Sequence, residues 1–303
     1  MNKTILIISG GAEAVPGIQL AKKLGLKVVV SDANPNAPGF EFADHKLIVS
    51  TFDVDATVMA ATKFHKNVSP IDGVICIASD VPLTVAKVAD ELKLPGISIA
   101  SATLATDKLA MKNRFLKDKV PVPWFTSIES ANDLKDKVKN KGFPLVVKPV
   151  DSRGSRGVLR LLEETDLEWA YNVAKEYSST GLVMLEKFMT GPQVSTESII
   201  VDGSAYTIGF SDRNYEFLDK YAPHIIENGG QLPSHLNFKT KKAVESLIQI
   251  SAKSMGIKNG IVKGDIVITN GEPYVIELAA RLSGGYFCTH EIPLNTGVDL
   301  VGA

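Results

Sequence analysis

The first hundred residues alternate short, uniformly apolar segments with amphipathic ones, and this alternation constrains the fold more than any other feature of the chain. The strand-like segments are TILIIS, KVVVSD, HKLIVS and GVICIAS, at residues 4–9, 27–32, 45–50 and 73–79. Helical patterns follow at residues 17–24, 54–65 and 81–92. Strands that are apolar along their whole length and separated by helices indicate a parallel sheet covered on both faces. This part of the chain is therefore predicted to form a Rossmann-like α/β lobe.

The pattern changes after residue 105. Thr106 is expected to cap a helix that begins in DKLAMKNRFLKDK, and the two prolines of VPVPWF mark a boundary between lobes. Strands are then predicted at residues 124–127, 144–148, 157–161, 182–188, 194–201 and 205–210. Helices are predicted at residues 131–139, 166–177 and 239–255. The absence of regular strand–helix alternation favours an α+β region here.

A hairpin is predicted near the C-terminal end, where Asn270-Gly271 separates GIVKGDIVIT from PYVIELA. Asp265 and Glu277 lie on either side of this turn, so paired strands bring them near each other. Like charges repel at close range, and a Mg²⁺ or Mn²⁺ ion that takes carboxylate oxygens is one reason for such a pair. The alternative is two carboxylates on solvated strand ends. Arg281 is expected to face the same cleft, where it can stabilise negative charge.

The stretch VVKPVDSRGSRGV ends an apolar run on Lys148 and continues into a segment with two glycines, two serines and two arginines. Small residues expose backbone N–H groups, and together with a nearby cation these suit an anion such as phosphate. The alternative is an ordinary hairpin whose charged side chains are solvated.

Charge and cysteine content exclude several classes of protein. The 33 basic and 34 acidic residues give a net charge of −1, which does not support binding to nucleic acid or to a membrane surface. Cys76 and Cys288 lie far apart in apolar surroundings, which indicates free thiols in a reducing, cytoplasmic compartment. The short apolar run after Met1 is too brief for a secretory signal, and no stretch approaches membrane-spanning length.

Several weak motifs occur in one order along nearly the whole chain: Lys108 in a capped helix, Lys148 before the glycine-containing loop, Glu186 in an EKF segment, and then the acidic pair followed by Arg281. This order and spacing resemble the ATP-grasp superfamily, in particular its carbamoyl-phosphate synthase, biotin carboxylase and amino-acid ligase branches. In that family a Rossmann-like lobe precedes two α+β subdomains that hold ATP between them. The resemblance implies a Rossmann-like domain at residues 1–105, a small lid subdomain at 106–185 and a C-terminal subdomain at 186–303.

The resemblance also implies a role for individual residues around the nucleotide. Lys108 and Lys148 would hold the ATP phosphates, and Glu186 would accept a hydrogen bond from the adenine amino group. The adenine ring edge would meet the backbone of Lys187 and Phe188. The loop from residue 151 to 157 would cover the phosphates through backbone N–H groups, including those of Ser152, Gly154, Ser155 and Gly157.

At the metal the resemblance implies Asp265 and Glu277 as ligands, with Arg281 and Lys148 as catalytic residues. The chain departs from the family at two positions. Gln193 stands where many members carry a ribose-binding glutamate, and its amide can do the same work. Ala279 stands where the family often has a metal-binding asparagine, which leaves one metal or two open.

Two further candidates remain. The glycine turn after the first strand, with Asp32 after the second, has the outline of a dinucleotide site but lacks the GxGxxG spacing. The irregular span from residue 212 to 237 carries Arg213, His224 and Glu227, which are candidate substrate contacts because long loops in compact domains are often functional. A structural role is the alternative for His224.

By resemblance, the expected function is that of an ATP-dependent ligase, which activates a carboxylate as an acyl phosphate for attack by an amine. A nucleotide-binding protein that lacks ligase activity is the alternative. A third interpretation, an NAD-dependent oxidoreductase, is supported only by the pattern of the first lobe. The expected partners are small carboxylates and amines, with a homodimer as the candidate assembly. The final GVDLVGA reads as the start of a helix, so a truncated C-terminal end is expected.

Overall fold

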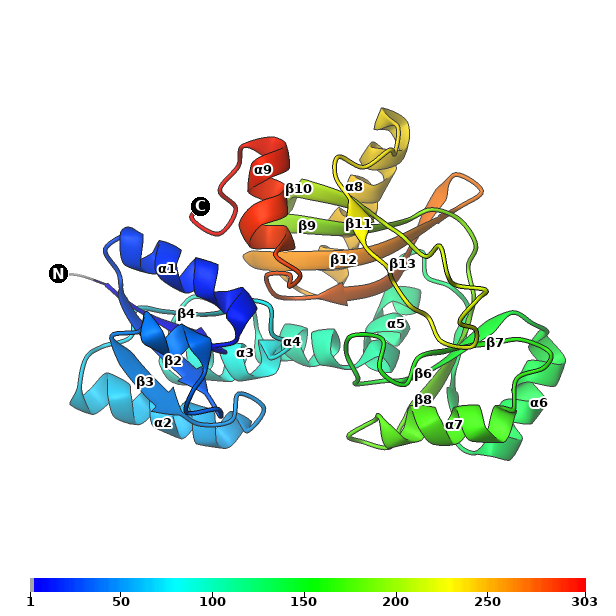
Figure 1. Ribbon diagram of the computed structural model, residues 1–303, viewed down its shortest axis with the longest axis horizontal. Coiled ribbons are helices and arrows are strands. Elements are labelled where there is room, and N and C mark those ends of the chain that lie inside the picture. The colour runs from blue at the N-terminus through cyan, green and yellow to red at the C-terminus, as the bar shows by residue number, and fades with distance from the viewer. Residues whose placement is uncertain (1–2) are drawn as a thin grey trace.

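A computed structural model describes residues 3–303 of the chain and arranges them around three β-sheets (Figure 1). The N-terminal lobe, drawn in blue, contains the first sheet. The sheet that carries the C-terminal hairpin lies at the upper centre of the view, and the remaining sheet lies at the lower right. Within the described residues, no helix combines the length and the apolar character needed to cross a bilayer.

The first sheet is wholly parallel and has the order β3-β2-β1-β4. Its strands are β1 (Thr4–Ile8), β2 (Lys27–Asp32), β3 (His45–Ile48) and β4 (Gly73–Cys76). Its helical segments are η1 (Ala12–Ala14), α1 (Val15–Lys23), η2 (Pro38–Glu41), α2 (Val54–Asn67) and α3 (Pro82–Glu91). In β1, Ile7 belongs to one core cluster, whereas Leu6 and Ile8 belong to another. Both faces of the sheet are therefore covered, and the predicted parallel α/β lobe is confirmed.

Two helices connect this lobe to the rest of the chain, α4 (Ile99–Thr106) and α5 (Lys108–Lys117). The prediction that Thr106 caps the second of them is wrong. Thr106 ends α4, and Asp107 caps α5 by accepting hydrogen bonds from the backbone N–H groups of Leu109 and Ala110, both at 2.9 Å. A carboxylate satisfies two free N–H groups and its charge suits the helix N-terminus, which explains why Asp107 takes this position.

The second sheet is antiparallel and has the order β5-β8-β6-β7. It contains β5 (Phe125–Ile128), β6 (Leu145–Pro149), β7 (Leu159–Leu161) and β8 (Val183–Lys187), with helices α6 (Ala131–Lys141) and α7 (Leu167–Glu176). Leu134 of α6 and Ala170 of α7 share a core cluster with Leu145 and Val147 of β6. The two helices therefore cover one face of this sheet, which leaves the other face to the site.

The third sheet is antiparallel and has the order β11-β10-β9-β12-β13. It contains β9 (Gln193–Val201), β10 (Ser204–Arg213), β11 (Gly230–Gln231), β12 (Gly260–Thr269) and β13 (Glu272–Ala279), followed by η3 (Phe287–Glu291) and α9 (Ile292–Thr296). Helix α8 (Phe238–Ser254) packs Val244 and Ile248 against β12 and β13. The predicted hairpin is confirmed, because Asn270 and Gly271 both have positive φ, 53° and 82°.

The first lobe and the third sheet share a hydrophobic core. Ile7 and Ile18 of the lobe cluster with Phe287 and Ile292 of the C-terminal segment. In addition, Ala78 donates a backbone hydrogen bond to Leu282, just past β13, at 3.2 Å. This packing brings the end of β4 beside the end of β13.

Candidate functional site

A cavity of about 260 Å³ lies where α5, the second sheet and the third sheet converge. Most of the residues that the sequence predicts for nucleotide, metal and substrate contacts line it. They are Lys108, Lys148, Ser152, Gly154, Ser155, Glu186, Lys187, Phe188, Gln193, Arg213, Asp265, Glu277 and Arg281. The fold thus brings side chains that are more than 170 residues apart in the sequence into the lining of one cavity.

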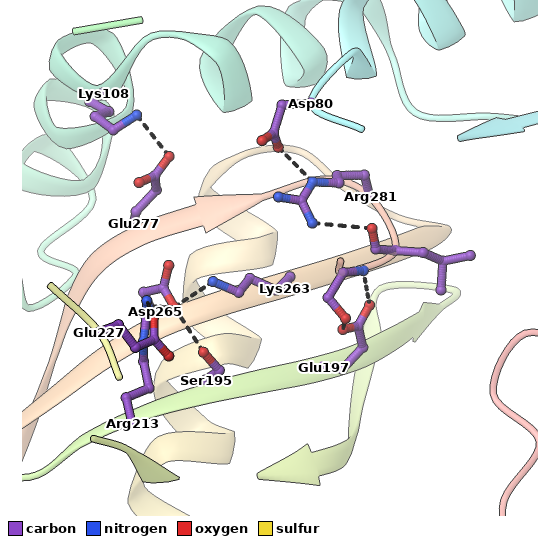
Figure 2. Close-up of polar contacts among 12 residues, drawn as sticks. Asp80, Lys108, Ser195, Glu197, Arg213, Glu227, Lys263, Asp265, Glu277 and Arg281 are labelled. Atoms are coloured by element: carbon purple, nitrogen blue, oxygen red, sulfur yellow. Dashed lines mark hydrogen bonds and ion pairs between the residues drawn. The ribbon is translucent and has the colours of Figure 1, made fainter. Parts of the chain in front are cut away.

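The acidic pair is central to this wall. Asp265 and Glu277 are direct partners in the β12–β13 ladder, as the sequence predicts, and the register shifts at a bulge immediately after Asp265. Figure 2 shows both carboxylates on the same side of the hairpin. Both side chains therefore reach the cavity from neighbouring strands.

Asp265 is surrounded by donors from its own strand, from the adjacent strand β9 and from β10, the next strand beyond β9 (Figure 2). Its Oδ1 accepts from Lys263 Nζ and Arg213 Nη1, each at 2.5 Å, and from Ser195 Oγ at 3.1 Å. Burial alone would raise the pKa of Asp265, but the charges of Lys263 and Arg213 outweigh burial and hold that pKa well below its usual range. The Asp265 carboxylate is therefore ionised.

Glu277 is paired with a cation from a different element. Its Oε1 lies 2.9 Å from Lys108 Nζ, at the first turn of α5. The same Nζ donates to the backbone oxygen of Ser152 at 2.6 Å. Lys108 thus joins the hairpin carboxylate to the loop that follows β6.

A buried ion cluster lies deeper in the cavity wall. Glu186 of β8 forms ion pairs with two lysines. Its Oε1 lies 2.6 Å from Lys112 Nζ, and its Oε2 contacts the Lys148 ammonium group. The exposed fractions are 2% for Glu186, 1% for Lys112 and 4% for Lys148. Burial lowers the pKa of Lys112 to about 8. Burial would raise the pKa of Glu186, but the two lysines reverse that effect and lower it. The structure thus places the predicted adenine acceptor Glu186 between two ammonium groups.

The loop after β6 is anchored at its start and leaves its tip on the cavity. The Asp151 carboxylate accepts hydrogen bonds from Ser178 Oγ at 2.7 Å and from the backbone N–H of Thr180 at 3.0 Å. Gly157, which has a φ of 72°, packs so closely that an added Cβ would meet Tyr177 Cβ at 2.7 Å. Gly157 therefore closes the loop without lining the cavity, while residues 152–155 face it.

Arg281 connects the site to the N-terminal lobe. Its Nε donates to Asp80 Oδ1 at 2.5 Å, and its Nη1 donates to the backbone oxygen of Leu282 at 3.1 Å. Burial would lower the pKa of Arg281, but Asp80 raises it. Because Asp80 follows β4 and also lines the cavity, the N-terminal lobe contributes a charged group to the site.

Glu197 is a fully buried carboxylate on β9, beside the chain segment that follows Arg281 (Figure 2). It accepts a hydrogen bond from the backbone N–H of Ser283 at 3.0 Å and another from the Ser283 hydroxyl. Burial raises the pKa of Glu197 to about 7 despite these donors. Glu197 therefore fixes the glycine-containing turn that follows Arg281.

The predicted residues of the irregular span after β10 differ in whether they reach the cavity. Arg213 lines the cavity and also pairs with Glu227, which holds the returning chain over the site. The structure does not bring His224 into the cavity: its ring is exposed and lies edge-on to Trp169, with centroids 6.2 Å apart. Asp32 accepts the backbone N–H of Gly10 at 2.9 Å and so ties the first glycine turn to β2.

Several charged residues of the site were not predicted, among them Arg153 of the loop after β6. Lys112 lies one helical turn after Lys108, and Lys263 lies two strand positions before Asp265, so each could have been found from helix or strand periodicity. Asp80 and Glu197 had no such local signal, because their partners lie 201 and 86 residues away in the sequence.

The acidic pair has the donor chemistry that a magnesium ion requires. Among residues 3–303, no group of three or more His, Cys, Asp and Glu side chains gathers as a metal cluster. Asp265 and Glu277 would therefore supply two carboxylates, and Mg²⁺ usually keeps several waters and binds substrate phosphates. Ala279 also lines this cavity and offers no ligand. The residues present thus fit a magnesium ion shared with a phosphate.

Comparison with known proteins agrees with this geometry. The model of the ATP-grasp domain family matches residues 105–285, and the ATP-grasp N-terminal domain matches residues 18–96. The D-alanine–D-alanine ligase of Azoarcus sp. (strain BH72) is 24% identical over 279 residues, which cover 90% of this chain and 86% of that protein. The resemblance and the fold class predicted from the sequence are both confirmed.

Solved structures show the same fold over the whole chain. The L-amino acid ligase from Bacillus licheniformis superposes with a TM-score of 0.82 at 24% identity, over 99% of this chain and 72% of that one. The biotin carboxylase from Campylobacter jejuni, solved as a β,γ-ATP complex, gives a TM-score of 0.78 at 21% identity, over 100% of this chain and 70% of that one. Several other curated relatives are matched over only 58% to 63% of their own length.

Proposed function

The chain belongs to the ATP-grasp family, and we propose that it is an ATP-dependent carboxylate–amine ligase that acts on an amino acid. One observation carries this proposal: three cations, Lys108, Lys148 and Arg281, converge with the paired carboxylates Asp265 and Glu277 in one cavity. Phosphoryl transfer depends on positioning and on neutralising phosphate charge more than on covalent catalysis. A cavity of this composition suits that requirement.

In the proposed reaction a carboxylate oxygen attacks the γ-phosphorus of ATP, the bond to the β-phosphate oxygen breaks, and ADP leaves. An amine then attacks the carbonyl carbon of the acyl phosphate, the bond from this carbon to the phosphate oxygen breaks, inorganic phosphate departs, and the nitrogen loses a proton to solvent. Lys108 and Lys148 hold the phosphates, and Arg281 stabilises the charge on the transferring group. Residues 152–155 cover the phosphates and exclude water from the acyl phosphate, which hydrolysis would otherwise waste.

A magnesium ion, when bound, neutralises phosphate oxygens and holds them in line for transfer. Asp265 and Glu277 are the residues proposed to hold it. For Glu277 to bind the metal ion, its ion pair with Lys108 must open. The ammonium group of Lys108 is then free to contact a phosphate. Around the nucleotide, the proposal keeps Glu186, the backbone of residues 187 and 188, and Gln193 as contacts.

The names of the relatives support the choice of substrate. One relative is named for ligation of D-alanine, and one solved neighbour is named an L-amino acid ligase. We therefore propose an amino acid as the carboxylate component. A nucleotide-binding protein without ligase activity is not favoured, because the relatives include D-alanine–D-alanine ligase and alanine–anticapsin ligase, and a solved neighbour is named an L-amino acid ligase.

The test is ADP release from MgATP across a matrix of carboxylates and amines, with Glu277→Gln as the blank. ADP release that requires one particular carboxylate supports the proposed ligase activity. ATP binding without release from any pair would overturn it.

The proposal also includes a cytoplasmic homodimer. The buried, free thiols of Cys76 and Cys288 support a reducing compartment. Light scattering of the purified protein tests the assembly, and a monomer mass at micromolar concentration would refute the dimer.

A further inference from the structure

A second cavity, of about 270 Å³, lies between the N-terminal lobe and the third sheet. Its wall is mainly apolar and comes from three places: Val74 of β4, Val85 of α3, and Ile261 at the start of β12. Cys76 also lines it, and burial raises the pKa of this thiol to about 12, so the thiol is neutral and adds to the apolar lining. No motif of the sequence accounts for this space.

Arg281 lines both cavities, so this residue lies at the boundary between the first cavity and the apolar space. The guanidinium carries five N–H donors, and its contacts with Asp80 and Leu282 use Nε and Nη1. A carboxylate bound to Arg281 would therefore face the phosphates on one side and have an apolar chamber on the other.

The partner of Arg281 adds a second constraint. Burial would raise the pKa of Asp80, but Arg281 lowers it, so Asp80 is an ionised carboxylate. An Arg–Asp pair presents one positive and one negative group a hydrogen bond apart. This is complementary to the carboxylate and ammonium groups of an amino-acid zwitterion.

We propose that the second cavity receives the side chain of the amino acid whose carboxylate is activated, and that this side chain is apolar. The carboxylate binds Arg281, the ammonium group binds Asp80, and the side chain extends between β4 and β12. This inference rests on the proposed ligase function and goes beyond it by naming the class of side chain. A charged side chain would lose its hydration in this mainly apolar chamber, so an apolar side chain is preferred.

The test compares L- and D-leucine with L- and D-alanine and with 4-methylpentanoate, which has the leucine skeleton without its ammonium group. Binding is measured by calorimetry in the presence of a non-hydrolysable ATP analogue and Mg²⁺, and ADP release is measured separately. One enantiomer of leucine is expected to bind at least about tenfold tighter than the matching alanine, because the extra carbons fill the chamber. Asp80→Asn is expected to remove the preference for leucine over 4-methylpentanoate.

Two variants, Val85→Phe and Ala280→Leu, each fill the chamber. The test can be made with either of them, so it survives if one variant fails to fold. Each is expected to remove the preference for leucine over alanine. Val68→Phe is the matched control, since it makes the same substitution at an exposed residue at the end of α2, 58% accessible, outside the cavity. Thermal unfolding confirms that each variant is folded.

The outcomes separate this inference from the ligase proposal. Equal binding of leucine and alanine to the unaltered protein, or a preference that survives in a folded chamber-filling variant, overturns the inference. ADP release that selects a small or charged acid would do the same while the ligase function stands. If no acid elicits ADP release, yet leucine binds and Val85→Phe abolishes that binding, the ligase proposal fails and the side-chain chamber stands.

Discussion

Asp265 and Glu277 are opposite each other in the β12–β13 ladder, yet each carboxylate is neutralised by a different lysine. Lys263, together with Arg213, holds Asp265, whereas Lys108 holds Glu277. The repulsion between the two carboxylates is therefore offset without a metal ion. A divalent cation and a polyphosphate can exchange partners with these residues, because the metal takes the carboxylates and the phosphates take the ammonium groups.

This exchange can be tested at Glu277, whose partner in the structure is Lys108. Glu277→Gln is expected to abolish turnover, with ADP release reduced at least about a hundredfold, because a neutral amide is a poor ligand for Mg²⁺. The measurement is ADP release at saturating MgATP. Glu272→Gln, at an exposed position at the start of the same strand, is the control and should retain full activity. Normal turnover in Glu277→Gln would refute the assignment of the metal site.

Lys148 is expected to act on the phosphates. Lys148→Ala should weaken MgATP binding at least about tenfold or abolish turnover, because a buried ammonium group in the cavity wall is lost. Calorimetric titration with ATP measures the effect. Lys141→Ala, at the exposed C-terminal end of α6, is the matched control. Unchanged affinity and unchanged turnover in the Lys148 variant would rule out the phosphate contact.

The buried cluster of Glu186 and its two lysines should contribute strongly to stability. Glu186→Gln leaves Lys112 and Lys148 buried without a counter-charge, so the free energy of unfolding is expected to fall by about 3–5 kcal/mol. Urea denaturation measures this change. Glu168→Gln breaks an exposed pair with Lys135 and is expected to cost less than about 1 kcal/mol. Equal losses in the two variants would contradict the role of burial.

Glu197 should make stability depend on pH. Its pKa rises from 4.5 to about 7 on folding, so its stabilising contribution is complete below pH 4.5 and is lost as the pH rises through about 7. Over this window the free energy of unfolding should fall by up to roughly 3 kcal/mol relative to Glu197→Gln, which cannot titrate. Urea denaturation of both proteins at a series of pH values gives the difference. A constant difference from pH 4.5 to 7 would show that Glu197 is ionised throughout.

The features predicted from the sequence are those that depend on local periodicity. Uniform apolarity predicts the parallel sheet, in which Leu6 and Ile7 are buried on opposite faces, and Asn270-Gly271 predicts the hairpin that opposes Asp265 and Glu277. In contrast, the pair of Lys112 and Glu186 joins residues 74 positions apart. Such contacts depend on how α5 packs against the second sheet, and no local pattern encodes that packing. The same holds for Asp80, which reaches Arg281 only because the first lobe packs beside the end of β13.

The central claim, that a carboxylate is activated as an acyl phosphate, is tested most directly by oxygen transfer. The carboxylate substrate identified by ADP release is labelled with ¹⁸O, turned over with unlabelled MgATP and amine, and the inorganic phosphate is analysed by mass spectrometry. The account predicts that each phosphate released carries one ¹⁸O atom, because the carboxylate oxygen that attacked the γ-phosphorus leaves with it. Unlabelled phosphate, formed alongside the amide product, would contradict the account.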